Sequence, residues 1–240
     1  RTIRARYQQS LLGWLWAIVQ PAASVVMFTV IFTVFIPVDT GGIPYPVFSF
    51  VGIVAWTLLA SSLTDMADSL VQNMTLITKI FFPRAALPTA AMLARVMDFA
   101  ISSLLLGLLM IGFNVTVNPA AMLFLPLIFA TQIALILGIG LGAAALNVYF
   151  RDIQPLLKLG LQLWFYASPI IYPIATVPEP LRRFYFLNPM AGLIESYRDV
   201  LIEGVPPGSY LQLSAILSLV ILAIGYVIFR RLEPRFADII

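Results

Sequence analysis

The chain has 240 residues, of which 61% are apolar and 10% are charged, and its formal net charge is +3. An ordinary soluble domain carries about 25% charged residues and cannot bury this much apolar surface. Cysteine and histidine are absent, which excludes disulfides, Cys or His metal ligands, thiol nucleophiles and imidazole acid–base catalysis. The composition therefore predicts an all-α membrane protein.

Apolar runs of membrane-spanning length recur along the chain. A bilayer core about 30 Å thick needs about 20 mainly apolar residues per helix, and polar or turn-forming segments such as 39–44 and 114–119 separate the runs. We predict a single transmembrane domain over residues 1–240 with six transmembrane helices. The predicted spans cover residues 14–36, 45–63, 87–113, 120–149, 156–172 and 210–229.

The distribution of basic residues predicts how this bundle is oriented in the membrane, because cytoplasmic loops carry an excess of lysine and arginine. With both termini in the cytoplasm, only Arg182, Arg183 and Arg198 remain outside. We interpret the positive net charge as this topology signal and expect no nucleic-acid partner. The chain opens without methionine, so we expect preceding residues, and no cleavable signal peptide is visible. The predicted inner side collects Arg1, Arg4, Arg6, Lys79, Arg84, Arg151, Lys158, Arg230, Arg231 and Arg235.

The segment 168–207, between the fifth and sixth spans, is too long and too apolar for a plain loop. Its prolines leave room for two short outer helices. Asn188 and Pro189 suit the cap and first position of the second helix, where Glu195 and Arg198 would share a polar face. We expect this helix to be amphipathic, to lie in the outer half of the membrane and to be re-entrant.

Two segments rich in aromatic and basic residues flank the predicted spans. Around Trp14 and Trp16 the sequence predicts either an interfacial anchor or an amphipathic interface helix that touches a partner or lipid. In Lys79-Ile80-Phe81-Phe82-Pro83-Arg84, two phenylalanines stand beside basic residues. Exposed apolar groups mark interaction sites, so we favour a docking surface over internal packing for this loop.

Three features inside the spans are open to a structural interpretation. Arg95 and Asp98 are three residues apart, so they share a helix face and can neutralise each other. The Gly-x-x-x-Gly spacing in 138–142 favours close packing within the bundle. The aromatic group Trp164, Phe165 and Tyr166 could line a sugar path or pack against lipid and neighbouring helices.

Several function classes remain as alternatives. No phosphate-binding loop of the Gly-x-x-x-x-Gly-Lys-Ser/Thr type is present, so the chain is not expected to hydrolyse ATP alone. A membrane-embedded lipid-sugar transferase would need a cluster of carboxylates or histidines, whereas Asp65 and Asp68 are the only close carboxylates at a predicted cytoplasmic span end. A proton-coupled flippase would need more intramembrane charges than Arg95 and Asp98.

The sequence resembles the transmembrane permease subunit of type-2 ABC exporters, specifically the bacterial group that exports O-antigen, capsule or teichoic acid. A drug or antibiotic exporter of the same superfamily is the alternative. The resemblance spans nearly the whole chain. It rests on Arg6-Tyr7-Gln8-Gln9-Ser10-Leu11-Leu12-Gly13, on residues 77–84, on Phe150-Arg151-Asp152, on Ser168-Pro169-Ile170-Ile171-Tyr172-Pro173, on Leu187-Asn188-Pro189 followed by Tyr197-Arg198, and on residues 233–238.

The resemblance implies a channel-forming homodimer in the bacterial inner membrane that moves a lipid-linked polysaccharide. Two separate nucleotide-binding subunits would bind ATP and Mg, and this chain would hold no cofactor. The segment 72–84 would be the coupling helix. By similarity the roles fall to Lys79, Phe81, Phe82, Pro83 and Arg84 for docking; Arg4, Arg6, Tyr7 and Gln8 for the interface helix; and Pro169, Tyr172, Asn188, Pro189, Tyr197 and Arg198 for an outer gate. Candidates for the channel lining are Trp14, Trp16, Trp164, Phe165 and Tyr166.

Overall fold

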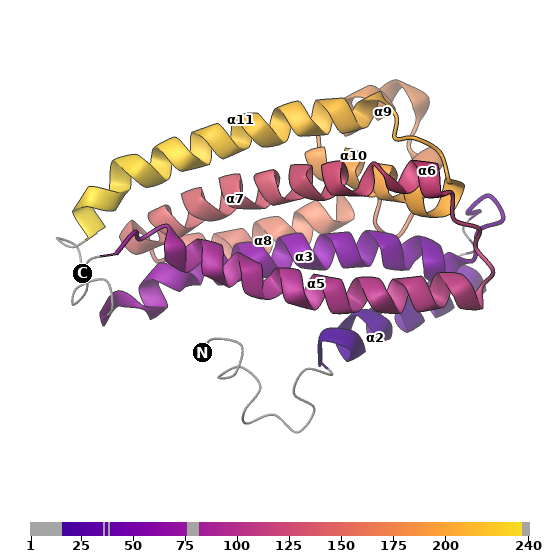
Figure 1. Ribbon diagram of the computed structural model, residues 1–240, viewed down its shortest axis with the longest axis horizontal. Coiled ribbons are helices and arrows are strands. Elements are labelled where there is room, and N and C mark those ends of the chain that lie inside the picture. The colour runs from indigo at the N-terminus through magenta and orange to yellow at the C-terminus, as the bar shows by residue number, and fades with distance from the viewer. Residues whose placement is uncertain (1–15, 36, 38, 76–81, 237–240) are drawn as a thin grey trace.

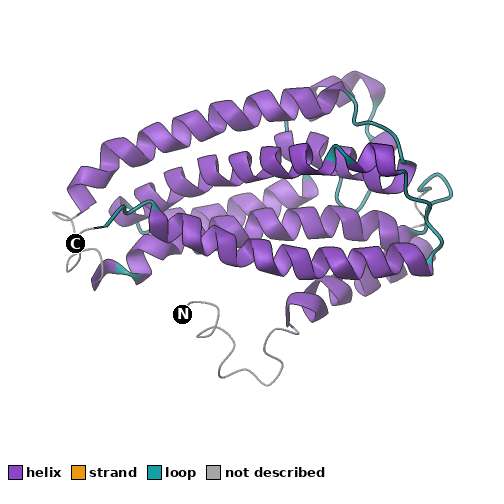
Figure 2. Ribbon diagram, in the orientation of Figure 1, coloured by secondary structure: helices purple, strands orange, loops and turns teal. Residues whose placement is uncertain are grey.

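The computed structural model describes residues 16–35, 37, 39–75 and 82–236, and within them every regular element is a helix (Figure 2). The all-α prediction is confirmed. Four helical segments are long and apolar enough to cross a membrane. They are α3 (Tyr45–Gln72), α5 (Ala86–Gly112), the α6–α7 unit (Pro119–Tyr149, with α6 Pro119–Met122 and α7 Leu125–Tyr149) and α11 (Ser209–Leu232).

The other two predicted spans correspond to shorter helices. Helix α2 (Trp16–Val30) continues as a π-helix, η2 (Ile31–Phe35). Helix α8 (Ile153–Tyr166) has 14 residues, which gives a length of about 21 Å at 1.5 Å per residue, less than the thickness of a bilayer core. Four spans are therefore supported by length and composition among the described residues, and the six-span count stays a prediction.

Helix α3 lies at the centre of the bundle, between α5, α7, α2, α8 and α10 (Figure 1). Of its apolar window 78% is buried, against 17–33% for the other three candidate spans. Helix α3 also runs to Gln72, beyond the predicted end at residue 63. Two acidic residues near its end, Asp65 and Asp68, do not stop the helix, because each has a partner on a neighbouring helix.

The remaining long helices present apolar side chains outward. On α5, Leu104, Leu108 and Ile111 are exposed, and on α11 so are Leu219 and Val220. Such a surface would be unfavourable in water and is stable in hydrocarbon. The exposed faces therefore fit the membrane-spanning interpretation of the composition.

Helices α7 and α11 cross at two glycines, as the predicted packing role of the glycine spacing requires. A Cβ atom at Gly225 would overlap the backbone carbonyl of Gly138, and one at Gly138 would lie 2.6 Å from the backbone of Ile221. Gly142 faces the same crossing: a Cβ atom added there would lie 3.6 Å from the Gly225 Cα. Only glycine allows this approach, and the prediction of close packing within the bundle is confirmed.

The connections gather at two ends of the bundle (Figure 1). One, which we call the C-terminal end, holds the residues before α5, the turn between α7 and α8, and η5 (Glu233–Arg235). The opposite end, called the α10 end, holds the turn before α3, the connection 113–118 and the segment 167–208. That segment forms η3 (Ile174–Thr176), α9 (Glu179–Tyr185), α10 (Pro189–Arg198) and η4 (Asp199–Glu203).

Candidate functional site

Helix α10 begins where the sequence predicts. The Asn188 side chain accepts a hydrogen bond from the backbone N–H of Met190 at 3.0 Å, and Pro189 occupies the first turn. Almost the whole helix is buried against α11, α3 and α7. Its place in the outer half of the membrane and its re-entrant course stay predictions.

Arg198 is the centre of the buried α10 end, with 2% of the residue exposed. Its guanidinium pairs with Glu195 at 2.8 Å, donates to the Ile170 carbonyl at 2.9 Å, and lies 3.6 Å from the centroid of the Phe48 ring. Burial lowers the pKa of Arg198, an effect that Glu195 opposes, and burial raises the pKa of Glu195, which Arg198 opposes. The charge therefore joins α10 to α3 and to the segment after α8.

A second set of polar contacts joins α8 to the cap of α10. The Trp164 indole N–H donates to Asn188 Oδ1 at 2.7 Å, and Asn188 Nδ2 donates to Ser168 Oγ at 2.9 Å. The hydroxyls of Tyr172 and Tyr185 lie 2.6 Å apart. Asn188 thus caps α10 and holds the end of α8 at the same time, an arrangement that keeps this segment in one conformation.

Tyr197 extends the polar contacts into the interior of the bundle. Its hydroxyl donates to Gln132 Oε1 at 2.8 Å, and Gln132 Nε2 donates to the Ala55 carbonyl at 2.7 Å. Gln132 and Tyr197 are both buried, and a buried amide without partners would be costly. Pro169 is buried as well, so all six residues predicted for the outer gate belong to one packed region; their gating role stays a prediction.

The aromatic residues predicted to line a channel differ in their exposure. Trp164 and Phe165 pack edge to face against Trp56, with ring centroids 5.8 and 5.7 Å away, and Phe165 also stacks on Phe28 at 6.1 Å. Tyr166 points away from the bundle with 61% of its surface exposed. Trp14 and the side chain of Trp16 lie outside the described residues.

The predicted interface helix and part of the coupling segment lie outside the described residues, namely Arg4, Arg6, Tyr7, Gln8, Lys79 and Phe81. Three residues of the docking set are described. Phe82 is partly buried against the core, Pro83 is exposed, and Arg84 donates to the Glu233 carbonyl and lies 5.8 Å from the centroid of the Phe236 ring. The start of α5 is therefore tied to the end of α11.

Arg95 pairs with Asp98, as the sequence suggested, and makes a stronger pair with Asp65, which the sequence did not suggest. Its Nη1 lies 3.2 Å from Asp98 Oδ2 on the same helix. Across to α3, its Nε and Nη2 contact the two oxygens of Asp65 at 2.7 and 3.1 Å. This fork-shaped pairing is the geometry in which arginine binds carboxylate most specifically. Asp68, one turn further along α3, accepts from the Gln154 side chain on α8.

Some of these contacts had a visible signal in the sequence. Gln132 and Asn147 are polar residues within an apolar span, which by itself predicts a hydrogen-bond partner. Asn147 donates to the Ala67 carbonyl at 2.9 Å. The partners themselves, and the Phe48 ring under Arg198, are distant along the chain and carry no local signal.

Few described residues are arranged for bond-making chemistry. Within the described ranges, no group of three or more Asp or Glu side chains is placed to hold a metal ion. The described ion pairs are local i,i+3 pairs, apart from Arg95 and Asp65, which join α5 to α3. An apolar helical bundle with paired internal charges defines a polytopic membrane protein.

Comparison with known proteins gives the family. Residues 1–202 match the family model described as ABC-2 type transporter. The O-antigen export system permease protein RfbA of Myxococcus xanthus is 32% identical, over 99% of this chain and 92% of its own length. The protein of the same name from Klebsiella pneumoniae is 29% identical, over 100% and 92%. The polysialic acid transport protein KpsM of Escherichia coli is 26% identical, over 97% and 91%.

The chain therefore belongs to the ABC-2 type transporter membrane family. The relatives reported above are named as an O-antigen export system permease protein or a polysialic acid transport protein, so the resemblance stated from the sequence motifs is confirmed.

Proposed function

We propose that this chain is the channel-forming permease subunit of an ATP-driven exporter that moves a lipid-linked, O-antigen-like polysaccharide across the bacterial cytoplasmic membrane. The observation that carries the proposal is the match over at least 97% of the chain to three permeases or transport proteins named for O-antigen or polysialic acid. A second copy of this chain would complete the channel, and two ATPase subunits would bind ATP and Mg.

Charge distribution supports a cytoplasmic location for the C-terminal end. The described arginines Arg84, Arg151, Arg230 and Arg231 all belong to this end, as the positive-inside rule requires of cytoplasmic segments. At the α10 end the described arginines are accompanied by acidic side chains, including Glu195, which pairs with Arg198. Both termini would then be cytoplasmic.

The contacts at the C-terminal end support a coupling role for residues 72–84. Arg84 joins the start of α5 to the end of α11 through the Glu233 carbonyl, and Arg95 joins α5 to α3 through Asp65. A partner that pushes on this segment would therefore move three membrane helices together as rigid elements. Part of the Phe82 ring is buried against the core, so docking would use its remaining surface and its neighbours.

Co-purification with an ATPase subunit tests the proposal. The permease is co-expressed with a candidate nucleotide-binding subunit, and complex formation and ATPase activity are compared with those of the variant Phe81→Asp plus Phe82→Asp. The matched control is Phe184→Asp, at an exposed phenylalanine on α9 at the opposite end. We expect the double variant to insert normally and lose the complex, while the control keeps it.

Two results would contradict the proposal in different ways. A permease that binds no candidate ATPase contradicts the exporter assignment. A complex that forms equally well with the double variant contradicts only the coupling role of the loop. Membrane insertion, measured by detergent extraction and size-exclusion chromatography, separates both results from misfolding.

A further inference from the structure

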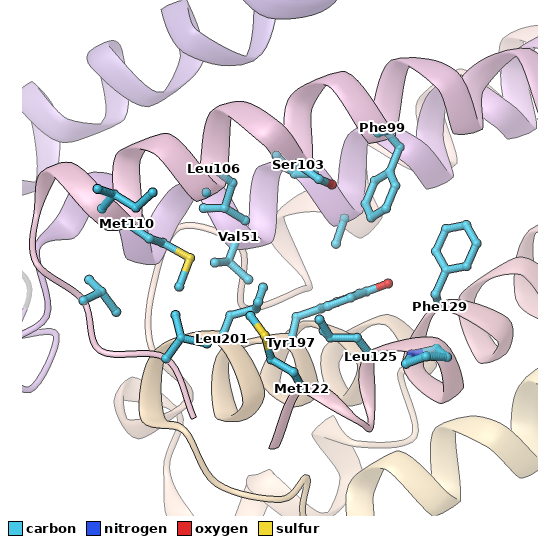
Figure 3. A pocket seen from close by; sticks show the side chains of 18 of the residues that line it. Val51, Phe99, Ser103, Leu106, Met110, Met122, Leu125, Phe129, Tyr197 and Leu201 are labelled. Atoms are coloured by element: carbon cyan, nitrogen blue, oxygen red, sulfur yellow. The ribbon is translucent and has the colours of Figure 1, made fainter. Parts of the chain in front are cut away.

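An apolar cavity of about 850 Å³ lies at the α10 end, between α5 and α7 with α3 and α10 at its back (Figure 3). The side chains of Leu106 and Met110 on α5 point into it toward Met122 and Leu125 (Figure 3). Helices α5 and α7 are consecutive antiparallel spans, yet the cavity separates them along this half of their length. This hollow borders the polar network at Tyr197 and lies away from the C-terminal end.

The lining of the cavity is hydrocarbon in character. Of the described residues that line it, only Ser103 and Tyr197 carry polar side-chain atoms. The Tyr197 hydroxyl is already bonded to Gln132, so its ring rather than its oxygen is available to an occupant. Water finds few hydrogen-bond partners in such a space, whereas apolar molecules enter it readily. The cavity is therefore suited to an apolar chain.

Small residues on α5 create part of the hollow. Gly107 lines the cavity, and a Cβ atom placed there would meet no other atom within 4 Å. A leucine at this position would project into the cavity instead of clashing with a neighbouring helix. The empty space next to Gly107 is thus large enough to be filled by an occupant or by a substituted side chain.

The cavity is long enough to hold a hydrocarbon chain of one membrane leaflet. The lining residues of α5 run from Val96 to Ile111, over which the helix rises roughly 22 Å; this exceeds half of a bilayer core of about 30 Å. The stacked rings of Phe99 and Phe129, with centroids 5.5 Å apart, lie toward one end of the cavity and Met110 lies toward the other (Figure 3). A hydrocarbon chain that enters from the membrane surface would reach the two rings.

The opposite end of the cavity meets a polar connection. Val115 and Val117 line the cavity, while Asn114, Thr116 and Asn118, which alternate with them, are exposed at the end of the bundle. The outward face of α5 beside the cavity is apolar, as its exposed leucines show. An amphiphile with its chain inside and its headgroup at residues 113–118 matches both surfaces.

We propose that this cavity binds one hydrocarbon chain of a bilayer phospholipid from the leaflet at the α10 end, with the headgroup at residues 113–118. The bound chain fills the space between α5 and α7 and is a stoichiometric part of the folded protein. The site does not depend on the proposed export function.

Lipid retention in detergent tests the proposal, without an ATPase or polysaccharide present. The purified permease is incubated with dioleoylphosphatidylethanolamine, washed in detergent and examined by native mass spectrometry. We expect one retained lipid per chain. The variant Gly107→Leu should lower this retention at least fivefold, and Ser103→Leu, also in the lining, should act in the same direction.

The matched control is Gly112→Leu on the same helix. Gly112 also has no atom within 4 Å of an added Cβ, but it does not line the cavity, so its substitution should leave retention unchanged. Equal retention in wild type and in whichever lining variant folds would overturn the proposal. A lining variant that disrupts the association of two copies while retaining the lipid would also overturn it, because the cavity would then be occupied by the second copy.

Discussion

The two ends of the bundle hold their arginines in different surroundings. At the α10 end Arg198 is enclosed by a carboxylate, backbone carbonyls and a phenyl ring. At the C-terminal end Arg230 pairs with Glu233 while 61% of its side chain is exposed. An enclosed charge contributes to the fold, because its removal leaves its oppositely charged partner buried and unpaired. An exposed charge contributes little to stability and is available to another molecule. Arg198 at the α10 end therefore contributes to the fold, whereas Arg230 at the C-terminal end stays accessible.

The largest expected effect on the free energy of unfolding is that of Arg198→Ala. The substitution leaves Glu195 buried without its partner, and breaking such a pair typically costs about 3–5 kcal/mol. Arg198→Ala should therefore lower the free energy of unfolding by that order, measured by equilibrium unfolding in mixed micelles. Arg230→Ala is the comparison and should change it by less than about 1 kcal/mol, because the side chain is mostly exposed. Equal effects at both positions would contradict the contrast between the two ends.

The next effect concerns the crossing of α7 and α11. Gly225→Ala places a methyl group on the Gly138 carbonyl, and overpacking of this kind costs about 1–3 kcal/mol. The melting temperature in detergent should fall. Gly160→Ala on α8 is the control: its added Cβ meets no atom within 4 Å, and alanine favours a helix more than glycine. A Gly225 variant as stable as wild type would show that the helices can separate at this point.

A smaller effect is expected for the link between α3 and α5. Arg95 is about three-quarters buried, with 23% of its side chain exposed, so its pairing should exceed that of a surface salt bridge. A double-mutant cycle with Arg95→Gln and Asp65→Asn should give a coupling energy of about 1–2 kcal/mol. The same cycle with Asp98→Asn should give less, since Asp98 makes one contact with Arg95 at 3.2 Å. Equal coupling would contradict the dominance of the inter-helix pair.

The smallest effect on stability should come from Arg84→Ala. Its contact is to a backbone carbonyl at a part-buried position, and one such hydrogen bond contributes about 1 kcal/mol. Its effect on ATPase binding should be larger, because the substitution releases the start of α5 from the end of α11. Melting temperature and co-purification are measured together. A large loss of stability with unchanged binding would remove the functional distinction between the two ends.

The start of α10 illustrates what local sequence can predict. A cap followed by proline depends on neighbouring residues, and both Asn188 and Pro189 take the predicted positions. The pattern along α10 did not reveal that α11, α3 and α7 bury almost the whole helix. Asp65 shows the same limit: its position near a charged segment suggested the end of a span, but Arg95 on another helix lets α3 continue.

The sequence by itself determined the class of protein and the family, and it located the apolar runs, of which the structure supports four as helices long enough to cross a membrane. These follow from composition, run length and local motifs, and none needs a distant contact. Only the tertiary structure decided which charges are enclosed, which arginine joins which helices, and where α5 and α7 leave a cavity. Those features depend on side chains that are far apart along the chain and meet only when the helices pack, as Arg198 and Phe48 do.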